Sequence, residues 1–257
     1  MDDVPPAAGG SAHFGEDGRR LDYGSYLRIP ELLRLQSTLT GAHDELLFIV
    51  VHQVYELWFR QLLHELEAVR DRMAEGDHRR AHHYLRRVAA IERLLVQQVE
   101  ILETMSPQDF LEFRAELAPA SGFQSVQFRE IEFISGLKDA GYLGRLDADA
   151  PERARLDRRL AEPTLWDAFL VAQAAAGAPP LEEIYRQSAR HGGLFDLCEG
   201  LLDHDQAFAL WRARHVLMVE RQIGGKTGTG GSTGAKYLRS TLDKRFFPEL
   251  WDVRSKL

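Results

Sequence analysis

Residues 41–75 read GAHDELLFIVVHQVYELWFRQLLHELEAVRDRMAE, and this stretch decides the fold class. It contains no proline, and its only glycine is the first residue. Its apolar side chains recur at the spacing of one helix face. Among them are Leu47, Val51, Tyr55, Phe59 and Leu62. A helix of this length spans about 50 Å at 1.5 Å per residue, so it must lie along a helix bundle.

The rest of the chain indicates the same class. Gly76-Asp77 ends the first pattern, and a second amphipathic stretch runs from 78 to about 105. Ser106-Pro107-Gln108-Asp109 is a helix start, because serine caps, proline suits the first position and aspartate favours free N–H groups. We expect that helix to reach about Leu117 and to stop before Pro119.

Further helices are expected downstream, and no convincing strand alternation is present. The sequence predicts a helix within 121–136, shorter helices joined by Gly and Pro turns over 137–195, and a long helix over 195–222. A glycine-rich loop covers 224–234, and a last helix precedes Pro248. We therefore predict an all-α fold, with residues 1–20 as a flexible arm and 21–257 as a single helical domain.

Composition narrows the function class. The 44% hydrophobic and 28% charged fractions of the 257 residues are typical of a soluble globular protein. A net charge of −7 argues against nucleic-acid or anionic-membrane partners. Cys198 is the only cysteine, which excludes an intrachain disulfide and fits a reducing compartment. The first 20 residues lack a signal-peptide pattern and no apolar run could span a membrane, so we expect a cytoplasmic protein.

Phe48 and His52 lie four residues apart and so share one helix face. His52 interrupts an otherwise apolar run. Taken alone, it is more often a hydrogen-bonded core histidine. The alternative is a histidine that lines a dry pocket, with Phe48 as an aromatic wall.

Phe110, Arg114 and Leu117 form a single stripe at i, i+4 and i+7. An arginine between two apolar side chains needs a partner, since a guanidinium is rarely buried alone. One interpretation is a salt bridge to an acidic residue elsewhere. The other is a clamp on the carboxylate of a ligand, because the planar guanidinium grips a carboxylate through two hydrogen bonds.

His215 shares a helix face with Trp211, Met218 and Val219. In isolation a structural role is the commoner one for such a histidine. An apolar helix face that offers one imidazole is also what a haem needs on its proximal side. Both interpretations stay open at this point.

The glycine-rich segment 224–234 is the most unusual part of the chain. It matches a phosphate loop poorly, because Gly225-Lys226-Thr227 comes at its start and follows a helix instead of a strand. We interpret it as a mobile loop that brings backbone N–H groups and the Thr229 hydroxyl to a small polar ligand. The histidines at 78, 82 and 83 have no carboxylate pattern to complete a metal site, and we interpret them as a solvated face.

Several blocks together resemble the tryptophan 2,3-dioxygenase family. The resemblance covers about Leu21 to Arg254 and is weakest over 137–195, which appears shorter than in relatives. The blocks are Tyr23-Gly24-Ser25-Tyr26-Leu27, FIVVHQVYELW at 48–58, Phe113-Arg114 with SGFQS at 121–125, Arg214-His215 with GTGGS at 228–232, and FFPELWDVR at 246–254.

This resemblance implies a long-helix bundle with a haem pocket and cleavage of the indole C2=C3 bond of L-tryptophan by O2. The product would be N-formylkynurenine, the first intermediate of tryptophan catabolism by the kynurenine pathway. It also implies a homotetramer with haem b, active as Fe²⁺. His215 would bind the iron, and Ser121 and Gly122 would contact the haem.

The resemblance assigns further roles around the substrate. His52 would face the indole N–H, with Phe48 and Leu117 as walls. Arg114 would bind the substrate carboxylate, and Thr229 would contact the amino and carboxylate end. Tyr23, Tyr26 and Leu27 would reach into the pocket of a neighbouring subunit. Phe110 stands where some relatives carry a tyrosine that binds the carboxylate, so anchoring should depend more on Arg114 and Thr229.

Three other functions remain to be weighed. They are a related haem enzyme that acts on another indole, a haem sensor or carrier without turnover, and a helical scaffold without a cofactor. Arg114 and Thr229 favour a free amino acid over a simple indole. No cysteine lies in a haem-ligand pattern, which argues against thiolate-ligated haem chemistry.

Overall fold

The structure is a computed structural model that describes residues 21–144, 149–230 and 234–257. The expected flexible arm over 1–20 lies outside the described residues. The chain divides into two compact units between Leu39 and Thr40. Within the described residues every regular element is a helix, which confirms the all-α expectation. The single domain expected over 21–257 stays a prediction.

The first unit carries two short helices, α1 (Tyr23–Leu27) and α2 (Ile29–Leu32). Asp22 caps α1 by accepting a hydrogen bond from the Ser25 backbone N–H at 2.7 Å. The Ser25 hydroxyl in turn accepts from the Asp22 backbone N–H at 2.9 Å, which completes a capping box. α1 leaves the large apolar side chains of Tyr23, Tyr26 and Leu27 exposed.

The second unit is built on α3 (His43–Ala74), the helix expected over 41–75. Asp44 and Glu45 lie in its first turn, where their negative charges stabilise the free backbone N–H groups of the helix start. Gly76 turns the chain with a φ of 80°, a backbone conformation that glycine adopts without strain. Asp77 then caps α4 (His78–Leu102) by accepting from the Arg80 backbone N–H at 3.0 Å.

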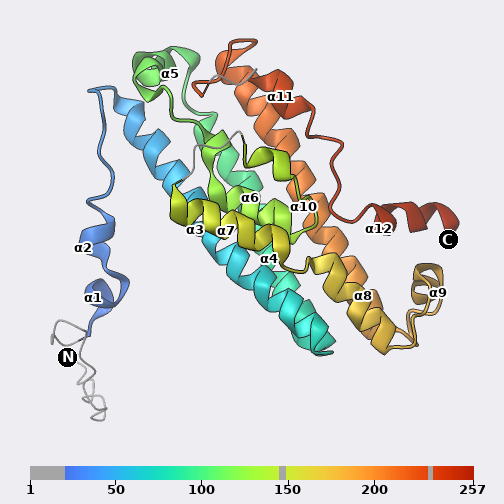
Figure 1. The fold of residues 1–257 in the computed structure, drawn as a ribbon. Coiled ribbons are helices and arrows are strands. Elements are labelled where there is room, and N and C mark those ends of the chain that lie inside the picture. Colours follow the sequence, from blue (N-terminus) through green and yellow to red (C-terminus); the bar gives the residue numbers. More distant parts are fainter. Residues whose placement is uncertain (1–20, 145–148, 231–233) are drawn as a thin grey trace, which may run out of the picture. The chain divides into compact units, whose positions relative to one another are not determined.

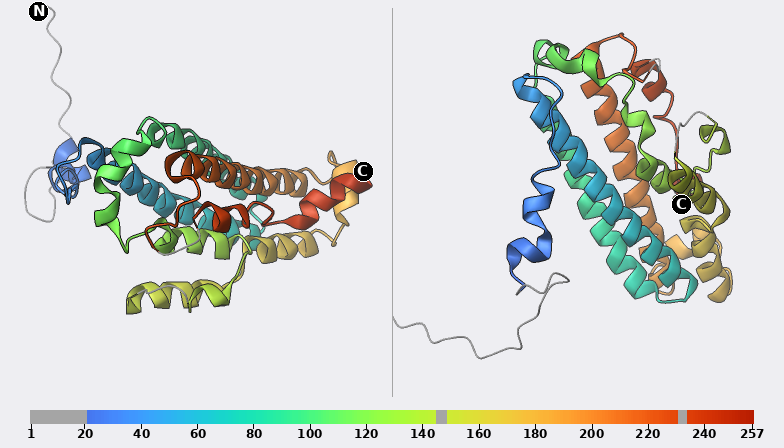
Figure 2. Two further views of the ribbon diagram at one scale, coloured as in Figure 1. Left: turned by 90° about the horizontal axis from the view of Figure 1, so that it is seen from above. Right: turned by 60° about the vertical axis from the view of Figure 1, so that its left-hand side comes forward.

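The third long helix, α10 (Gly192–Ile223), matches the helix expected over 195–222. α4 packs against both α3 and α10, and the three long helices run side by side (Figures 1 and 2). The core fills the space that these helices and α8 enclose. Leu62, Leu66, Val69 and Met73 of α3 are completely buried there. Each such side chain contributes about 1.5–3 kcal/mol, which explains why the apolar stripe dictates the fold.

Shorter helices cover the long ones. α6 and α8 pack on α3, and α7 packs on α6. The short helices of the second unit are α5 (Pro107–Phe113), α6 (Val126–Ile134), α7 (Ala150–Ala161), α8 (Leu165–Ala175), α9 (Leu181–Arg186), α11 (Ala235–Arg239) and α12 (Pro248–Asp252). Single 3₁₀ turns are η1 (Arg114–Leu117), η2 (Gly122–Gln124), η3 (Ala140–Tyr142) and η4 (Val253–Lys256).

Two helix boundaries differ from expectation. The α-helix that starts at Pro107 ends at Phe113, and residues 114–117 continue as the 3₁₀ turn η1. Ala118 has an extended backbone because it precedes Pro119. The last turn before Ala118 has the tighter 3₁₀ geometry, which is common at helix ends. The structure also has α12, which begins at Pro248, because proline is favoured in the first turn of a helix.

Buried polar groups fix α10 against its neighbours. His204 is bonded through Nδ1 to Glu92 Oε1 of α4 at 2.6 Å, and through Nε2 to Ser135 Oγ at 2.8 Å. Asp205 Oδ2 accepts from the backbone N–H groups of Phe246 and Phe247 at 3.0 and 3.1 Å. These bonds hold the helix that carries His215 at a defined position.

No helix in the described part of the chain combines the length and the apolar character needed to cross a membrane.

Candidate active site

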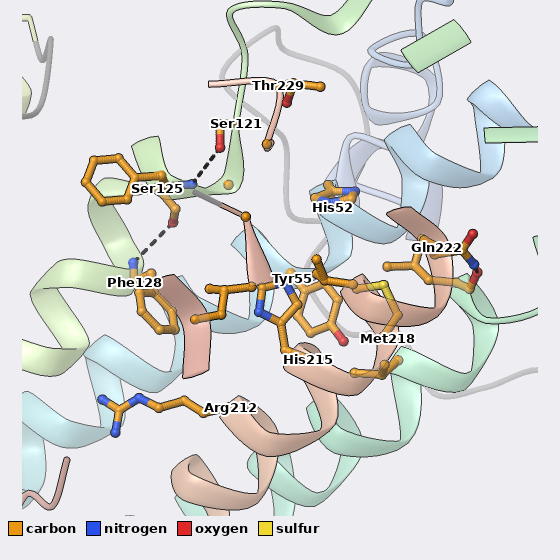
Figure 3. Close-up of a pocket in the computed structure, with 18 of the residues that line it drawn as sticks. His52, Tyr55, Ser121, Ser125, Phe128, Arg212, His215, Met218, Gln222 and Thr229 are labelled. Carbon is orange, nitrogen blue, oxygen red and sulfur yellow. Dashed lines mark hydrogen bonds between the residues drawn. The ribbon is translucent and has the colours of Figure 1, made fainter. Parts of the chain in front are cut away.

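A cavity of about 280 Å³ lies within the second unit, between α3, α6 and α10 and the segments 105–125, 228–229 and 234–241 (Figure 3). This volume is close to the lower end of the range for small-molecule and cofactor sites, roughly 300–1,000 Å³. Its walls are mainly aromatic and aliphatic. They include Phe48, Tyr55, Phe59, Phe110, Phe123, Phe128, Trp211, Met218 and Val219.

The fold brings most of the expected site residues to this cavity. Those that line it are Phe48, His52, Phe110, Arg114, Ser121, Gly122, His215 and Thr229. Leu117 packs against the hydrophobic core and is not among the lining residues. Tyr23, Tyr26 and Leu27 belong to α1 of the first unit, with exposed fractions of 78%, 71% and 42%. Gly231 and Ser232 lie outside the described residues.

His52 is set up as a hydrogen-bond acceptor. Its Nδ1 lies 2.7 Å from the carbonyl oxygen of Phe48, one turn earlier on α3. Because a carbonyl only accepts, Nδ1 carries the proton and donates it. Burial lowers the pKa of His52, although the bond to Phe48 and the charge of Glu56 oppose that shift. The neutral ring therefore keeps a bare Nε2 that can accept a hydrogen bond from a ligand.

His215 is also neutral and lines the cavity from α10. Burial lowers its pKa to about 4, and the nearby His52 adds to the shift. Among the described residues, no protein group forms a hydrogen bond with either of its ring nitrogens. It differs in this from His204 on the same helix, which is bonded through both nitrogens. A neutral imidazole that faces a cavity is a suitable metal ligand.

One imidazole suits an iron whose other ligands come from a porphyrin. Across the described ranges, no group of three or more His, Cys, Asp or Glu side chains is placed to hold a bare metal ion. A haem needs only an axial ligand from the protein, together with apolar walls for the macrocycle. His215 and the aromatic walls of the cavity meet both requirements.

Arg114 and Thr229 join two segments at the cavity. Arg114 follows α5 directly, and its Nη2 donates to the Thr227 carbonyl oxygen. The Thr229 hydroxyl donates to the Ala120 carbonyl oxygen at 2.6 Å. In the described part of the chain Arg114 forms no ion pair, so the salt bridge that sequence reasoning left open is not found there.

Gly230 permits the close approach of these two segments. A Cβ at this position would lie 2.5 Å from Ser121 Cβ. We expect Gly230→Ala to push the loop away from the cavity and to weaken binding of a ligand there about tenfold, since such overpacking costs ~1–3 kcal/mol. Gly225→Ala is the matched control, because a Cβ there meets nothing within 4 Å. Equal ligand affinities of the two variants in a titration would contradict this role.

The sequence reasoning missed a buried ion network at the cavity wall. Glu132 of α6 accepts from Arg129 Nη1 at 2.5 Å and from Arg212 Nη2 at 2.9 Å. All three side chains are buried and line the cavity, and they leave one positive charge in excess. Arg129 Nε is buried without a hydrogen-bond partner. The available signal was three charged residues, Arg129, Glu130 and Glu132, within the mainly apolar sequence VQFREIEFI.

The family model described as tryptophan 2,3-dioxygenase matches residues 7–147 and 164–257. The chain belongs to the tryptophan 2,3-dioxygenase family. A tryptophan 2,3-dioxygenase from a Nocardioides species is 56% identical over 95% of this chain and 97% of its own length. Those of Herpetosiphon aurantiacus and Caulobacter vibrioides are 47% and 42% identical, each over 92% of this chain and 98% of its own length.

Membership of the tryptophan 2,3-dioxygenase family confirms the resemblance drawn from the sequence blocks. The gap in the family match, 148–163, falls inside the segment where that resemblance was weakest. This gap corresponds largely to α7, which packs on α6 and contributes no residue to the cavity wall.

Proposed function

We propose that the chain is a haem-dependent dioxygenase that cleaves the indole C2=C3 bond of L-tryptophan with O2 and yields N-formylkynurenine. The relatives carry the name of this activity. The observation that carries the proposal is that His52 and His215 (Figure 3), both neutral, line one aromatic cavity together with Arg114. This arrangement offers an iron ligand, an acceptor for an indole N–H and a donor for a carboxylate.

The proposed cofactor is haem b, active in the ferrous state, and His215 is the residue that would hold its iron. When bound, it would supply the iron centre that binds and activates O2. The excess positive charge of Arg129 and Arg212, and the unpaired Arg129 Nε, suit the haem carboxylates. Ser121 and Gly122 line the same cavity and would contact the haem.

Arg114 and Thr229 would hold the amino-acid head of the substrate. The bond to Thr227 uses one of the five N–H donors of Arg114, which leaves donors for a carboxylate. The Thr229 hydroxyl donates its proton to Ala120, so its lone pairs can accept from the substrate ammonium group. The two side chains are therefore complementary to a zwitterion.

The indole would lie against aromatic rings, with its N–H directed to His52. Phe48 and Phe110 are stacked with ring centroids 5.8 Å apart, and Phe48 lies 4.1 Å from the His52 ring. Phe110 has no hydroxyl, so this wall is apolar and excludes water from the indole. Leu117 packs behind the wall in the core, and its contact with substrate stays a prediction.

We expect His52→Ala to lower kcat/KM about two- to tenfold without abolishing turnover, because the indole N–H loses one hydrogen bond worth ~0.5–1.5 kcal/mol. The initial rate of N-formylkynurenine formation is the measurement. His64→Ala, an exposed histidine on the same helix, is the control. Complete loss of activity in His52→Ala with normal haem content would contradict a positioning role.

A homotetramer is the assembly that we propose. Tyr23 and Tyr26 of α1 are largely exposed in the single chain, which suits side chains that enter a neighbouring subunit. The three long helices also expose aliphatic side chains that a subunit contact would cover. These are Leu46, Val50, Leu57, Leu94, Ile101, Leu210 and Leu217. Light scattering should give four times the 29.2 kDa chain mass, and a monomer mass would contradict the assembly.

The proposed location is the cytoplasm. The only cysteine, Cys198, is a buried free thiol whose pKa burial raises to about 12, so it is kept reduced and unreactive. Cell fractionation tests this, and recovery of the protein outside the cytoplasm would contradict it.

The activity itself is tested by incubating the haem-loaded ferrous protein with O2 and L-tryptophan. We expect the absorbance of N-formylkynurenine to appear. Tight tryptophan binding without product would assign a sensor, and turnover of simple indoles but not of tryptophan would assign a different substrate. Either outcome would overturn the proposed reaction.

A further inference from the structure

The ring of His215 is stacked on the indole of Trp211, one turn earlier on α10. Their centroids are 5.0 Å apart, and their planes differ by 19°. The two residues share a helix face at i and i+4, so the backbone of α10 fixes their separation. Stacking restricts rotation about the second side-chain torsion of histidine, which is otherwise broad.

Trp211 is itself held on several sides by aromatic rings from three helices. Phe128 of α6 lies 5.3 Å from it, and Phe208 of α10 lies 6.0 Å away. Tyr55 and Phe59 of α3 meet the indole edge to face, at 6.1 and 6.5 Å. The indole is therefore a rigid surface for the imidazole that rests on it.

Two further histidines, His52 in the cavity and His204 on α10, are oriented differently. His52 is oriented by its hydrogen bond to Phe48, and His204 by its bonds to Glu92 and Ser135. In most metal sites a ligating histidine is likewise oriented by a hydrogen bond from its second nitrogen. For His215, the stack with Trp211 is the contact among the described residues that defines the plane of the ring.

We propose that Trp211 is a positioning residue that sets the plane of the His215 imidazole toward the haem iron. The inference deepens the proposed function and rests on it, because it requires His215 to be the axial ligand. Trp211 acts through His215 and needs no contact with substrate. Its loss should broaden the distribution of imidazole orientations and weaken the iron–nitrogen bond.

The experiment is resonance Raman spectroscopy of the haem-loaded ferrous protein, which observes the iron–histidine stretching band directly. We expect the band of Trp211→Met to broaden and to move to lower frequency. Trp211→Phe keeps an aromatic ring and should show a smaller change of the same kind. If Trp211→Met loses its helical circular dichroism and so does not fold, Trp211→Phe is the variant that tests the proposal.

Trp166→Met is the matched control. Trp166 stacks on Phe169 of the same helix, with centroids 5.0 Å apart and planes 21° apart, and it does not line the cavity. Its loss removes an equivalent aromatic stack from the fold, so the iron–histidine band should keep its wild-type position and width. If Trp211 served only the stability of the fold, Trp211→Met and Trp166→Met would change the iron–histidine band alike.

The outcomes separate this inference from the proposed function. A wild-type band in both Trp211 variants, or an equal change in Trp166→Met, would overturn the positioning role. The band should vanish in His215→Ala. If it persisted there, His215 would not be the ligand, and the proposed iron site would fail as well.

Discussion

Replacing His215 with alanine should abolish haem retention in a chain that still folds. Alanine is a good helix former, and the His215 side chain forms no hydrogen bond with the described residues, so α10 should persist. Loss of a residue that only supports a metal ligand costs ~10–100-fold in metal affinity, and loss of the ligand itself should cost at least that much. The Soret absorbance per chain is the measurement, with circular dichroism to confirm the helices.

Two further variants sharpen this prediction. His52→Ala removes the other cavity histidine and should keep its Soret band, because His52 is not expected to bind the iron. His215→Gly leaves space for a free imidazole, and added imidazole should restore haem binding. A normal Soret band in His215→Ala would remove the basis for the iron site.

Replacing Arg114 with alanine should weaken L-tryptophan binding about ten- to a hundredfold. The reason is the loss of a charge-assisted hydrogen bond to the carboxylate, worth ~1.5–3 kcal/mol. Arg114→Lys keeps the charge but loses the planar pair of donors, so an intermediate affinity is expected. Calorimetric or spectroscopic titration with L-tryptophan gives the dissociation constants.

Arg114 also holds the loop at Thr227, so a control for loop disorder is needed. 3-Methylindole has the ring of tryptophan without its carboxylate. Its affinity should change little in Arg114→Ala if the arginine binds the carboxylate, and should fall with that of tryptophan if the arginine only orders the loop. An unchanged affinity for L-tryptophan would rule out the carboxylate clamp.

The long helices could be predicted from the sequence because their buried side chains recur with the period of a helix. Val51, Tyr55, Phe59 and Leu62 fall at helical spacing, and all four are buried in the structure. The end of the first long helix could also be predicted, because the turn at Gly76 and the cap at Asp77 depend only on residues a few positions away. Boundaries that depend on local backbone chemistry could therefore be placed to within a few residues.

The residues that line the cavity could be predicted from the sequence only in part. A regular helix through 107–117 would have placed Phe110, Arg114 and Leu117 on one face, but the 3₁₀ turn after Phe113 rotates the later positions. Arg114 still lines the cavity, whereas Leu117 packs into the core. A preference for 3₁₀ over α geometry in four residues is too small in free energy to be inferred from periodicity.

Contacts between distant segments could not be inferred from one sequence. Arg212 and Glu132 meet only because α10 and α6 pack together, and neither residue belongs to a local pattern that indicates the other. The stack of Trp211 on His215 is different, because the i, i+4 spacing is visible in the sequence. Its orientation, however, depends on rings from α3 and α6.

The account depends on one arrangement, in which His215 binds the haem iron and Arg114 binds the amino-acid head in the same cavity. A crystal structure of the ferrous haem-loaded protein with L-tryptophan tests it most directly. The account predicts a bond from a His215 ring nitrogen to iron, the tryptophan carboxylate on Arg114, and the indole N–H facing His52. Iron bound to any other side chain, or a carboxylate held away from Arg114, would contradict it.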